Sequence, residues 1–128
     1  MTRTVIQTDG APAGLAGYSQ GIKAGGMVYV SGMAGVDPAT GKLVGATIQE
    51  QTGQCLRNVQ AVLEAAGSSL DKVVWALWSL RDPEDFDGFN EEWARWFTHE
   101  PPARHGARLP LPERLSGVLI SIGVIAEA

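Results

Sequence analysis

The run Val73-Val74-Trp75-Ala76-Leu77-Trp78-Ser79-Leu80 is apolar at nearly every position. A strand with one face in water alternates apolar and polar residues, whereas a strand buried on both faces is apolar almost throughout. Residues 73–80 therefore predict a central strand of a sheet, buried on both faces. One of these faces could be covered by another subunit.

A helix is predicted on the N-terminal side of this strand. Thr47-Ile48-Gln49-Glu50 fits a capping box, in which the threonine hydroxyl and the glutamate carboxylate satisfy free N–H groups at the helix start. Gly67 supplies the left-handed residue that commonly ends a helix. Between these points one apolar stripe recurs at helical spacing, formed by Ile48, Cys55, Val59, Val62 and Leu63.

A second helix is predicted on the C-terminal side. Asp82-Pro83-Glu84-Asp85 combines a capping aspartate, a first-turn proline and acids that suit the positive end of the helix dipole. Pro101-Pro102 ends the helix because proline cannot continue it. One aromatic stripe, formed by Phe86, Phe89, Trp93 and Phe97, predicts core packing.

Further strands are predicted from short runs between turn residues. They are residues 4–7, 19–23, 27–31, 103–109 and 118–126. Ala24-Gly25-Gly26 suits a hairpin turn, residues 37–42 form a loop, and residues 110–114 are a proline-interrupted connection. We predict one domain over residues 1–128, an α+β fold with a six-stranded mixed sheet and two helices on one face, in an order close to βββαββαβ.

Composition argues against several classes of function. The chain of 128 residues has a formal net charge of -4, so it has no general attraction for nucleic acid or anionic lipid. One cysteine, Cys55, and two histidines are too few for a disulfide framework or a metal site. No signal peptide and no apolar run of about 18 residues is present. We expect a cytoplasmic protein with no metal, no cofactor and no membrane or nucleic-acid partner.

Arg104 is the residue best suited to bind a small ligand. It follows Pro101-Pro102-Ala103 at the start of a predicted strand, where a planar guanidinium can bind a carboxylate through two parallel hydrogen bonds. Phosphate-binding, dinucleotide-binding and nucleophile-elbow motifs are absent. From the residue alone, the alternative is a surface ion pair with an acid such as Glu100 or Glu113.

The order of several segments resembles one family. The segments are Ala16-Gly17-Tyr18-Ser19-Gln20, Val28-Tyr29-Val30-Ser31-Gly32, residues 37–45 and residues 62–74, followed by Asp85-Phe86, Asn90, Phe97, Pro101-Pro102-Ala103-Arg104 and Ile125-Ala126. In this pattern the chain resembles the RidA family, also called YjgF or reactive intermediate deaminase. The resemblance spans nearly the whole chain.

This resemblance implies a chorismate-mutase-like fold, assembled as a homotrimer whose sheets form a central barrel and whose sites lie between neighbouring subunits. It also implies hydrolysis of enamines or imines such as 2-aminoacrylate to a 2-keto acid and ammonia, without a metal or organic cofactor. The partner would be a small carboxylate metabolite.

The resemblance assigns site residues by position. Arg104 matches the carboxylate-binding arginine, Tyr18 the pocket tyrosine and Asn90 the helix asparagine, and we predict these three as catalytic. The predicted substrate-binding residues are Arg104, Ser31 and Gly32 at the Val-Ser-Gly strand end, Gly106 beside the arginine, and Gly123. Tyr18 and Asn90 could instead be ordinary exposed residues, and Ser31-Gly32 could simply end a strand.

The last strand departs from the family pattern. Typical members read Glu-Ile-Glu-Ala-Ile-Ala, and the second glutamate is thought to position or activate the attacking water. Here the run is Ser121-Ile122-Gly123-Val124-Ile125-Ala126, so Ser121 replaces the first acid and Gly123 the second. General acid/base help contributes about 10²- to 10⁴-fold, so the usual mechanism should be weakened by that order unless another group substitutes.

Three residues are candidates to replace the missing acid of the last strand: His105, Glu113 and Glu127. His105 should face away from Arg104, because neighbouring residues in a strand point to opposite faces. The family usually has a glutamine at the position of Met33 and an aromatic residue at the position of Ser79. These differences indicate a pocket of altered shape. Trp75 and Trp78 are either interface core or new lining.

Three functions remain open. The first is an enzyme that processes carboxylate-bearing enamines or imines. The second is a non-catalytic trimer that binds a 2-keto or amino acid, and the third is a specialised pathway enzyme, a lyase or cyclisation catalyst, with a pocket enlarged at Gly123. Some relatives are described as ribonucleases, but the net charge and the lack of a basic aromatic platform argue against this activity.

Overall fold

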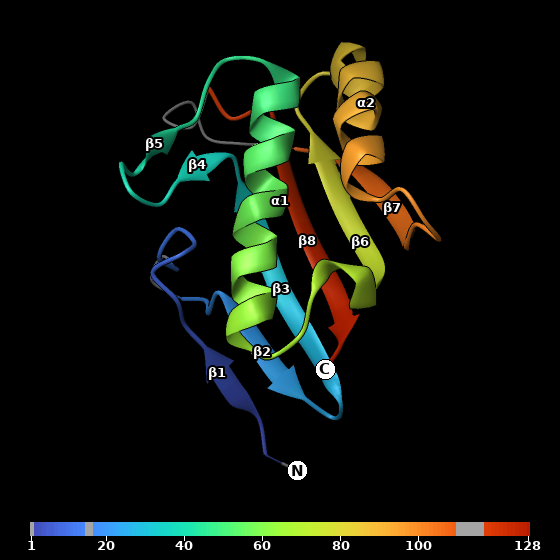
Figure 1. The fold of residues 1–128 in the computed structure, drawn as a ribbon. Helices are drawn as coiled ribbons and strands as arrows, with labels where there is room; N and C mark the ends of the chain where they lie inside the picture. The colour runs from blue at the N-terminus through green and yellow to red at the C-terminus, as the bar shows by residue number, and fades with distance from the viewer. Residues whose placement is uncertain (1, 15–16, 110–116) are drawn as a thin grey trace.

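The structure is a computed structural model that describes residues 2–14, 17–109 and 117–128 (Figure 1). The predicted connection at residues 110–114, with Glu113, lies outside the described residues. The main sheet has six strands in the order β1-β2-β3-β8-β6-β7. Their bounds are β1 Thr4–Ile6, β2 Gly21–Ala24, β3 Met27–Ala34, β6 Val73–Leu80, β7 Ala103–Arg108 and β8 Ile120–Glu127.

The sheet is mixed, as predicted. Strands β6 and β7 are parallel, and the other neighbouring strands are antiparallel. Helices α1 (Ile48–Ala65) and α2 (Phe86–Trp96) cover the same face (Figure 1). The predicted α+β fold with two helices on one face is therefore confirmed.

The order βββαββαβ is wrong in its second half, although the predicted residue ranges of the elements run in the observed order. The main elements follow the order βββαβαββ, with α2 between β6 and β7, which is also where the predicted residue ranges place the second helix. Parallel neighbours need a crossover connection, and a helix commonly provides it. A small hairpin, β4 (Val36–Asp37) with β5 (Lys42–Leu43), occupies the predicted loop at residues 37–42.

Helix α1 packs as its sequence predicts. The Thr47 side chain accepts a hydrogen bond from the Glu50 N–H, so the capping box is present. Gly67 follows the helix with φ 82°. The five residues of the predicted apolar stripe are buried in the core.

Helix α2 begins slightly later than predicted. Asp82 caps a short 3₁₀ turn, Pro83–Asp85, by accepting a hydrogen bond from the Glu84 N–H, and the α-helix starts at Phe86. The predicted aromatic stripe packs as a continuous row: ring centroids are 6.3 Å apart for Phe86–Phe89, 5.6 Å for Phe89–Trp93 and 4.4 Å for Trp93–Phe97.

Strand β6 is buried on one face only. Val73, Ala76 and Leu80 are buried beneath the helices, whereas Trp75 and Leu77 are 39% and 43% exposed. The prediction of burial on both faces is thus wrong for a single chain. Both helices lie on one face, and no third layer covers the other face in the described residues. We call this uncovered side the open face.

Strand β3 does not end at Ser31-Gly32, contrary to expectation. It continues to Ala34, and its register with β8 shifts between Val30 and Met33. Such a bulge bends a strand and changes the direction of its side chains. The bulge places the Gly32 backbone close to β8.

Candidate functional site

Arg104 lies on β7, at the edge of the sheet, and its side chain extends beneath α2. Its Nη2 donates a 2.6 Å hydrogen bond to Oδ1 of Asn90. The guanidinium carbon lies 5.1 Å from the Trp93 ring centroid, 5.2 Å from Phe89 and 5.8 Å from Trp78. Distances of this kind favour cation–π attraction, which holds the charged group beside the aromatic row.

The guanidinium of Arg104 has unused binding capacity. Its Nη1 is buried without a hydrogen-bond partner, and among the described residues no carboxylate forms an ion pair with it. Glu100 was a predicted alternative partner, but its Oε2 lies instead 3.9 Å from Nε2 of His99. Burial lowers the pKa of Arg104, yet an arginine stays protonated in proteins. The group is therefore a half-buried cation available to an anionic ligand.

Gly106 lies two residues farther along β7 and packs against Trp78. A Cβ at this position would lie 2.0 to 2.5 Å from atoms of the indole ring. The Trp78 ring cannot move aside easily, since its centroid lies 5.4 Å from the ring centroid of Phe86 and 5.2 Å from that of Phe89. The indole thereby forms one wall of a cavity of about 540 Å³, which Phe86 and Gly106 also line.

A second group of predicted residues lies around the β3 bulge. Tyr18, Gly32 and Ser121 line a cavity of about 370 Å³. The Ser31 hydroxyl donates a 2.6 Å hydrogen bond to the carbonyl of Ser19, which anchors the segment before β2. A Cβ on Gly123 would lie 3.1 Å from the Val30 carbonyl oxygen and 3.2 Å from the Gly32 nitrogen. Backbone of β3 therefore lies close to Gly123, which also lines a cavity of about 290 Å³.

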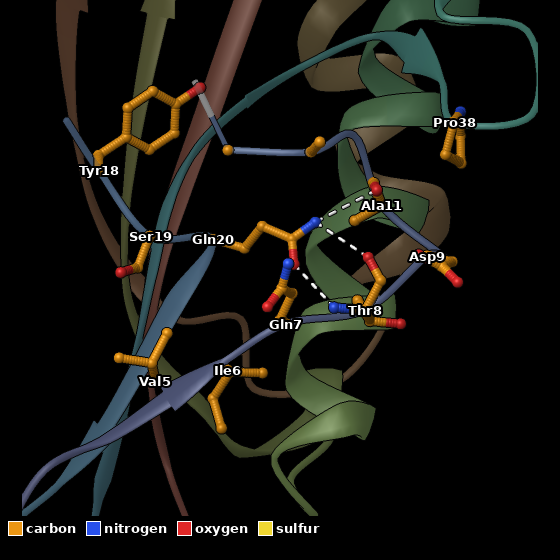
Figure 2. Close-up of a pocket in the computed structure, with 12 residues that line it drawn as sticks. Val5, Ile6, Gln7, Thr8, Asp9, Ala11, Tyr18, Ser19, Gln20 and Pro38 are labelled. Atoms are coloured by element: carbon orange, nitrogen blue, oxygen red, sulfur yellow. Dashed lines mark hydrogen bonds between the residues drawn. The ribbon is translucent and has the colours of Figure 1, made fainter. Parts of the chain in front are cut away.

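Tyr18 also borders a neighbouring cavity of about 490 Å³ (Figure 2). Its side chain is 49% exposed. The segment around it is fixed by Gln20, whose buried amide donates hydrogen bonds to the carbonyls of Thr8, Ala11 and Pro12. Figure 2 shows the Tyr18 ring apart from these hydrogen bonds, so its hydroxyl lies at the rim rather than in the polar network.

The two groups do not meet within one chain. Two strands, β8 and β6, separate β3 from β7, which corresponds to roughly 14 Å between the outer strands. Arg104 faces α2, whereas Gly123 belongs to the set of β8 residues that alternates with the buried Ile122 and Val124 and faces the open side. Within one chain, Arg104 is therefore hydrogen-bonded to Asn90, and Tyr18 lines the same cavity as Gly32.

His105 lies on the open face, as predicted. Its ring stacks on Trp75 with a centroid distance of 6.5 Å and an interplanar angle of 14°. Glu127 is exposed at the end of β8. Neither residue is placed beside the Arg104 guanidinium.

Two residues near these groups were not assigned a role from the sequence. Trp78 was left as core or lining, and it contacts both Arg104 and Gly106. Ser121 departs from the family pattern in the last strand, and it borders two cavities. Their proximity arises from cross-strand packing, for which the linear sequence carries no local signal.

The described residues contain no group of three or more histidine, cysteine or acidic side chains that could hold a metal ion. Cys55 is buried beside the Ile120 carbonyl, and desolvation raises the pKa of its thiol. A buried thiol of raised pKa is unreactive. In residues 2–14, 17–109 and 117–128, no helix is long and apolar enough to cross a membrane.

Comparison with known proteins identifies the family. A family profile described as endoribonuclease L-PSP matches residues 8–128. A RutC family protein of Saccharolobus solfataricus is 45% identical, with 98% of each chain covered. The chain belongs to the RidA (YjgF) family. The family prediction from sequence is confirmed.

Two further relatives carry informative names. The 2-iminobutanoate/2-iminopropanoate deaminase of Capra hircus is 38% identical to this RidA-family chain, covering 81% of the chain and 76% of its own length. The crystal structure of Escherichia coli TdcF with bound serine matches with a TM-score of 0.89 and 32% identity, covering 98% of each chain.

Proposed function

We propose that this RidA-family protein hydrolyses small imines or enamines that carry a carboxylate, such as 2-aminoacrylate, to a 2-keto acid and ammonia. The observation that carries the proposal is the half-buried Arg104 guanidinium, with its free Nη1 and no described acidic partner. A goat relative is named as a deaminase of 2-iminobutanoate and 2-iminopropanoate, both of which are imines with a carboxylate.

The proposed site lies between two subunits of a homotrimer. Arg104 and Asn90 would come from one subunit, and Tyr18, Gly32 and Ser121 from its neighbour. The apolar open face supports assembly, because Tyr29, Trp75 and Leu77 are each about 40% exposed there, and exposed apolar patches commonly mark interfaces.

The proposed mechanism needs little beyond binding and positioning. Arg104 binds the carboxylate through charge-assisted hydrogen bonds, and Asn90 fixes the direction of the guanidinium. An enamine such as 2-aminoacrylate first takes up a proton on its terminal carbon and loses one from nitrogen, which gives the imine. Water then adds to the imine carbon and the electron pair of the C=N bond moves to nitrogen, which takes up a proton. Loss of ammonia then leaves the 2-keto acid.

The test is ammonia release from 2-aminoacrylate generated in situ. We expect a rate above that of buffer, and a decrease of roughly 10- to 100-fold in kcat/KM for Arg104→Ala, since hydrogen bonds to charged groups contribute about 1.5 to 3 kcal/mol. Arg95→Ala, an exposed arginine of α2, is the matched control and should keep the wild-type rate. A wild-type rate equal to that of buffer would contradict the proposal.

A second function, carboxylate binding without catalysis, is favoured by the lack of a side chain at Gly123. TdcF was crystallised with serine, which also carries a carboxylate. In this case 2-ketobutyrate should bind in calorimetry and Arg104→Ala should weaken binding, while no ammonia is released. Absence of binding at millimolar 2-ketobutyrate would rule this function out.

The other functions receive less support. A pathway enzyme with a pocket enlarged at Gly123 stays an alternative: Gly123 lines a cavity of about 290 Å³, but β3 backbone approaches the position of a Cβ to 3.1 to 3.4 Å. For the ribonuclease activity named by the family profile, the net charge of -4 is unfavourable because RNA binding depends on neutralising phosphates.

A further inference from the structure

The open face carries two serines among apolar side chains. Ser79 of β6 and Ser121 of β8 are directly opposite each other in an antiparallel pair, and both are half-buried. They line a cavity of about 290 Å³ whose walls include Trp75, Leu77 and Ile125. Opposed Cβ atoms in such pairs lie roughly 5 Å apart, so one water molecule or ligand atom can contact both hydroxyls.

The fold does not use these hydroxyls. In the part of the chain that the structure describes, neither the Ser79 nor the Ser121 hydroxyl has a hydrogen-bond partner. Ser31 differs, because its hydroxyl is bonded to the Ser19 carbonyl. A hydroxyl without a partner in apolar surroundings is unfavourable. The two serines are therefore suited to take their partners from water or from a ligand.

Ser121 lies at the junction of two cavities. It lines the cavity of about 290 Å³ and also the cavity of about 370 Å³ that Tyr18 borders. Gly32 lies next to it, since a Cβ on this glycine would be 2.7 Å from the Ser121 Oγ. The Ser121 Oγ thus lies beside Gly32, within the group that the proposed function places on one side of the site.

Gly123, the next β8 residue on this face, has no side chain, and it lines the same cavity with the β3 backbone close beside it. A Cβ at this position would lie 3.1 Å from the Val30 carbonyl oxygen and 3.2 Å from the Gly32 nitrogen, so the β3 backbone would have to shift slightly. Among the β8 residues that line this cavity, the Ser121 hydroxyl is the polar side chain, with Ser79 of β6 beside it, whereas Glu127 lies at the exposed end of the strand.

We propose that Ser121, supported by Ser79, positions the attacking water in place of the acid that the last strand lacks. The inference rests on the proposed function, in which Arg104 of the adjacent subunit holds the carboxylate of the substrate. Ser121 accepts a hydrogen bond from the water, whose oxygen forms the new bond to the imine carbon. The proton passes through the hydroxyl to the nitrogen, so the serine is unchanged when ammonia leaves.

A hydroxyl positions water but does not retain its proton, so its contribution is smaller than that of a carboxylate. For Ser121→Ala we expect kcat for ammonia release to fall roughly 3- to 10-fold, as expected for one neutral hydrogen bond. The dissociation constant of 2-ketobutyrate should not change. Ser69→Ala, an exposed hydroxyl bonded to Asp71, is the control and should match the wild type in both measurements.

The opposite substitution tests the role directly. Ser121→Glu places a carboxylate where the water is held, and it should raise kcat by about 10-fold or more, because general base help contributes roughly 10²- to 10⁴-fold. Its kcat should also fall as the pH drops below the pKa of the new carboxylate. If residue 121 had a purely structural role, kcat would show no such decrease at low pH.

The outcomes separate the two proposals. A wild-type rate above buffer together with an unchanged kcat in Ser121→Ala overturns the role of the serine alone. The same holds if the loss of kcat is matched by an equal weakening of 2-ketobutyrate binding. A wild-type rate equal to that of buffer overturns the proposed deaminase function and the serine role together.

Discussion

At the residue scale, the charge of Arg104 is controlled by its neutral neighbours. Asn90 accepts one hydrogen bond and the aromatic rings of Trp78, Phe89 and Trp93 surround the guanidinium without neutralising it. A carboxylate in place of the asparagine oxygen would form a half-buried ion pair. The neutrality of residue 90 is therefore what leaves the cation free for a ligand.

Asn90→Asp should weaken ligand binding while leaving the fold stable. The new carboxylate would occupy the Arg104 guanidinium and compete with the carboxylate of the ligand. We expect the dissociation constant of 2-ketobutyrate, measured by calorimetry, to rise at least about 10-fold, with an equal or higher melting temperature. Glu91→Gln on the exposed side of α2 is the control, and an unchanged affinity in Asn90→Asp would contradict the proposed role of Arg104.

Gly106 and Trp78 should behave as a coupled pair. Gly106→Ala forces a Cβ against a ring that its neighbours hold in place, so unfolding in urea should show a loss of about 1 to 3 kcal/mol. Adding Trp78→Leu should make the double variant more stable than the sum of the single effects, by about 1 kcal/mol or more. Ala107→Val, at the exposed neighbouring position, should be near neutral, and strict additivity would contradict the coupling.

At the element scale, α1 combines an apolar stripe with buried amides that bind loops. Gln51 donates to the carbonyls of Gly45 and Gly117 and accepts from the Leu119 N–H. Asn58 donates to the carbonyls of Ala34 and Val36. These bonds fix the ends of β3 and β8, the two strands that carry the bulge and Ser121.

Gln51→Ala should destabilise the protein by about 2 to 4 kcal/mol, because it leaves one N–H and two carbonyls without their partner. Urea unfolding measures this loss. Glu64→Ala, at an exposed position on the same helix, should change the free energy of unfolding by less than about 0.5 kcal/mol. Equal stability of the two variants would show that water replaces the amide at no cost.

At the scale of the whole molecule, the sheet is covered by helices on one face only. The open face presents Tyr29, Trp75 and Leu77, and the two groups of site residues lie on different strands and faces of the sheet. Assembly of several chains would cover the apolar residues and would bring the groups together. Assembly and catalysis should therefore depend on the same surface.

Leu77→Asp should prevent assembly, because it places a charge in the centre of the proposed interface. Analytical ultracentrifugation should report a trimer for the wild type and a monomer for the variant, which should also lose ammonia release. Val44→Asp is the matched control, since Val44 is 38% exposed but lies outside the main sheet. A wild-type mass for Leu77→Asp would contradict an interface on the open face.

The sequence by itself determined the elements and the family. The Thr47–Glu50 capping box, the aromatic stripe of α2 and the glycine turn before β3 depend on residues within a few positions of one another, so local patterns predict them. The Arg104 motif was also recognisable, because the proline pair that precedes it is contiguous in sequence. The parallel pairing of β6 with β7 was not predicted, because strand pairing across a helical crossover leaves no local pattern in the sequence.

Only the tertiary structure decided how these residues are grouped. The contact of Arg104 with Asn90, the indole over Gly106, the β3 backbone beside Gly123 and the pairing of Ser79 with Ser121 join residues that are 14 to 93 positions apart in the chain. Strand register and the bulge fix these contacts, and a shift of one residue would turn each side chain to the other face. Long-range packing therefore decided which polar groups of this RidA-family chain are free to meet a substrate.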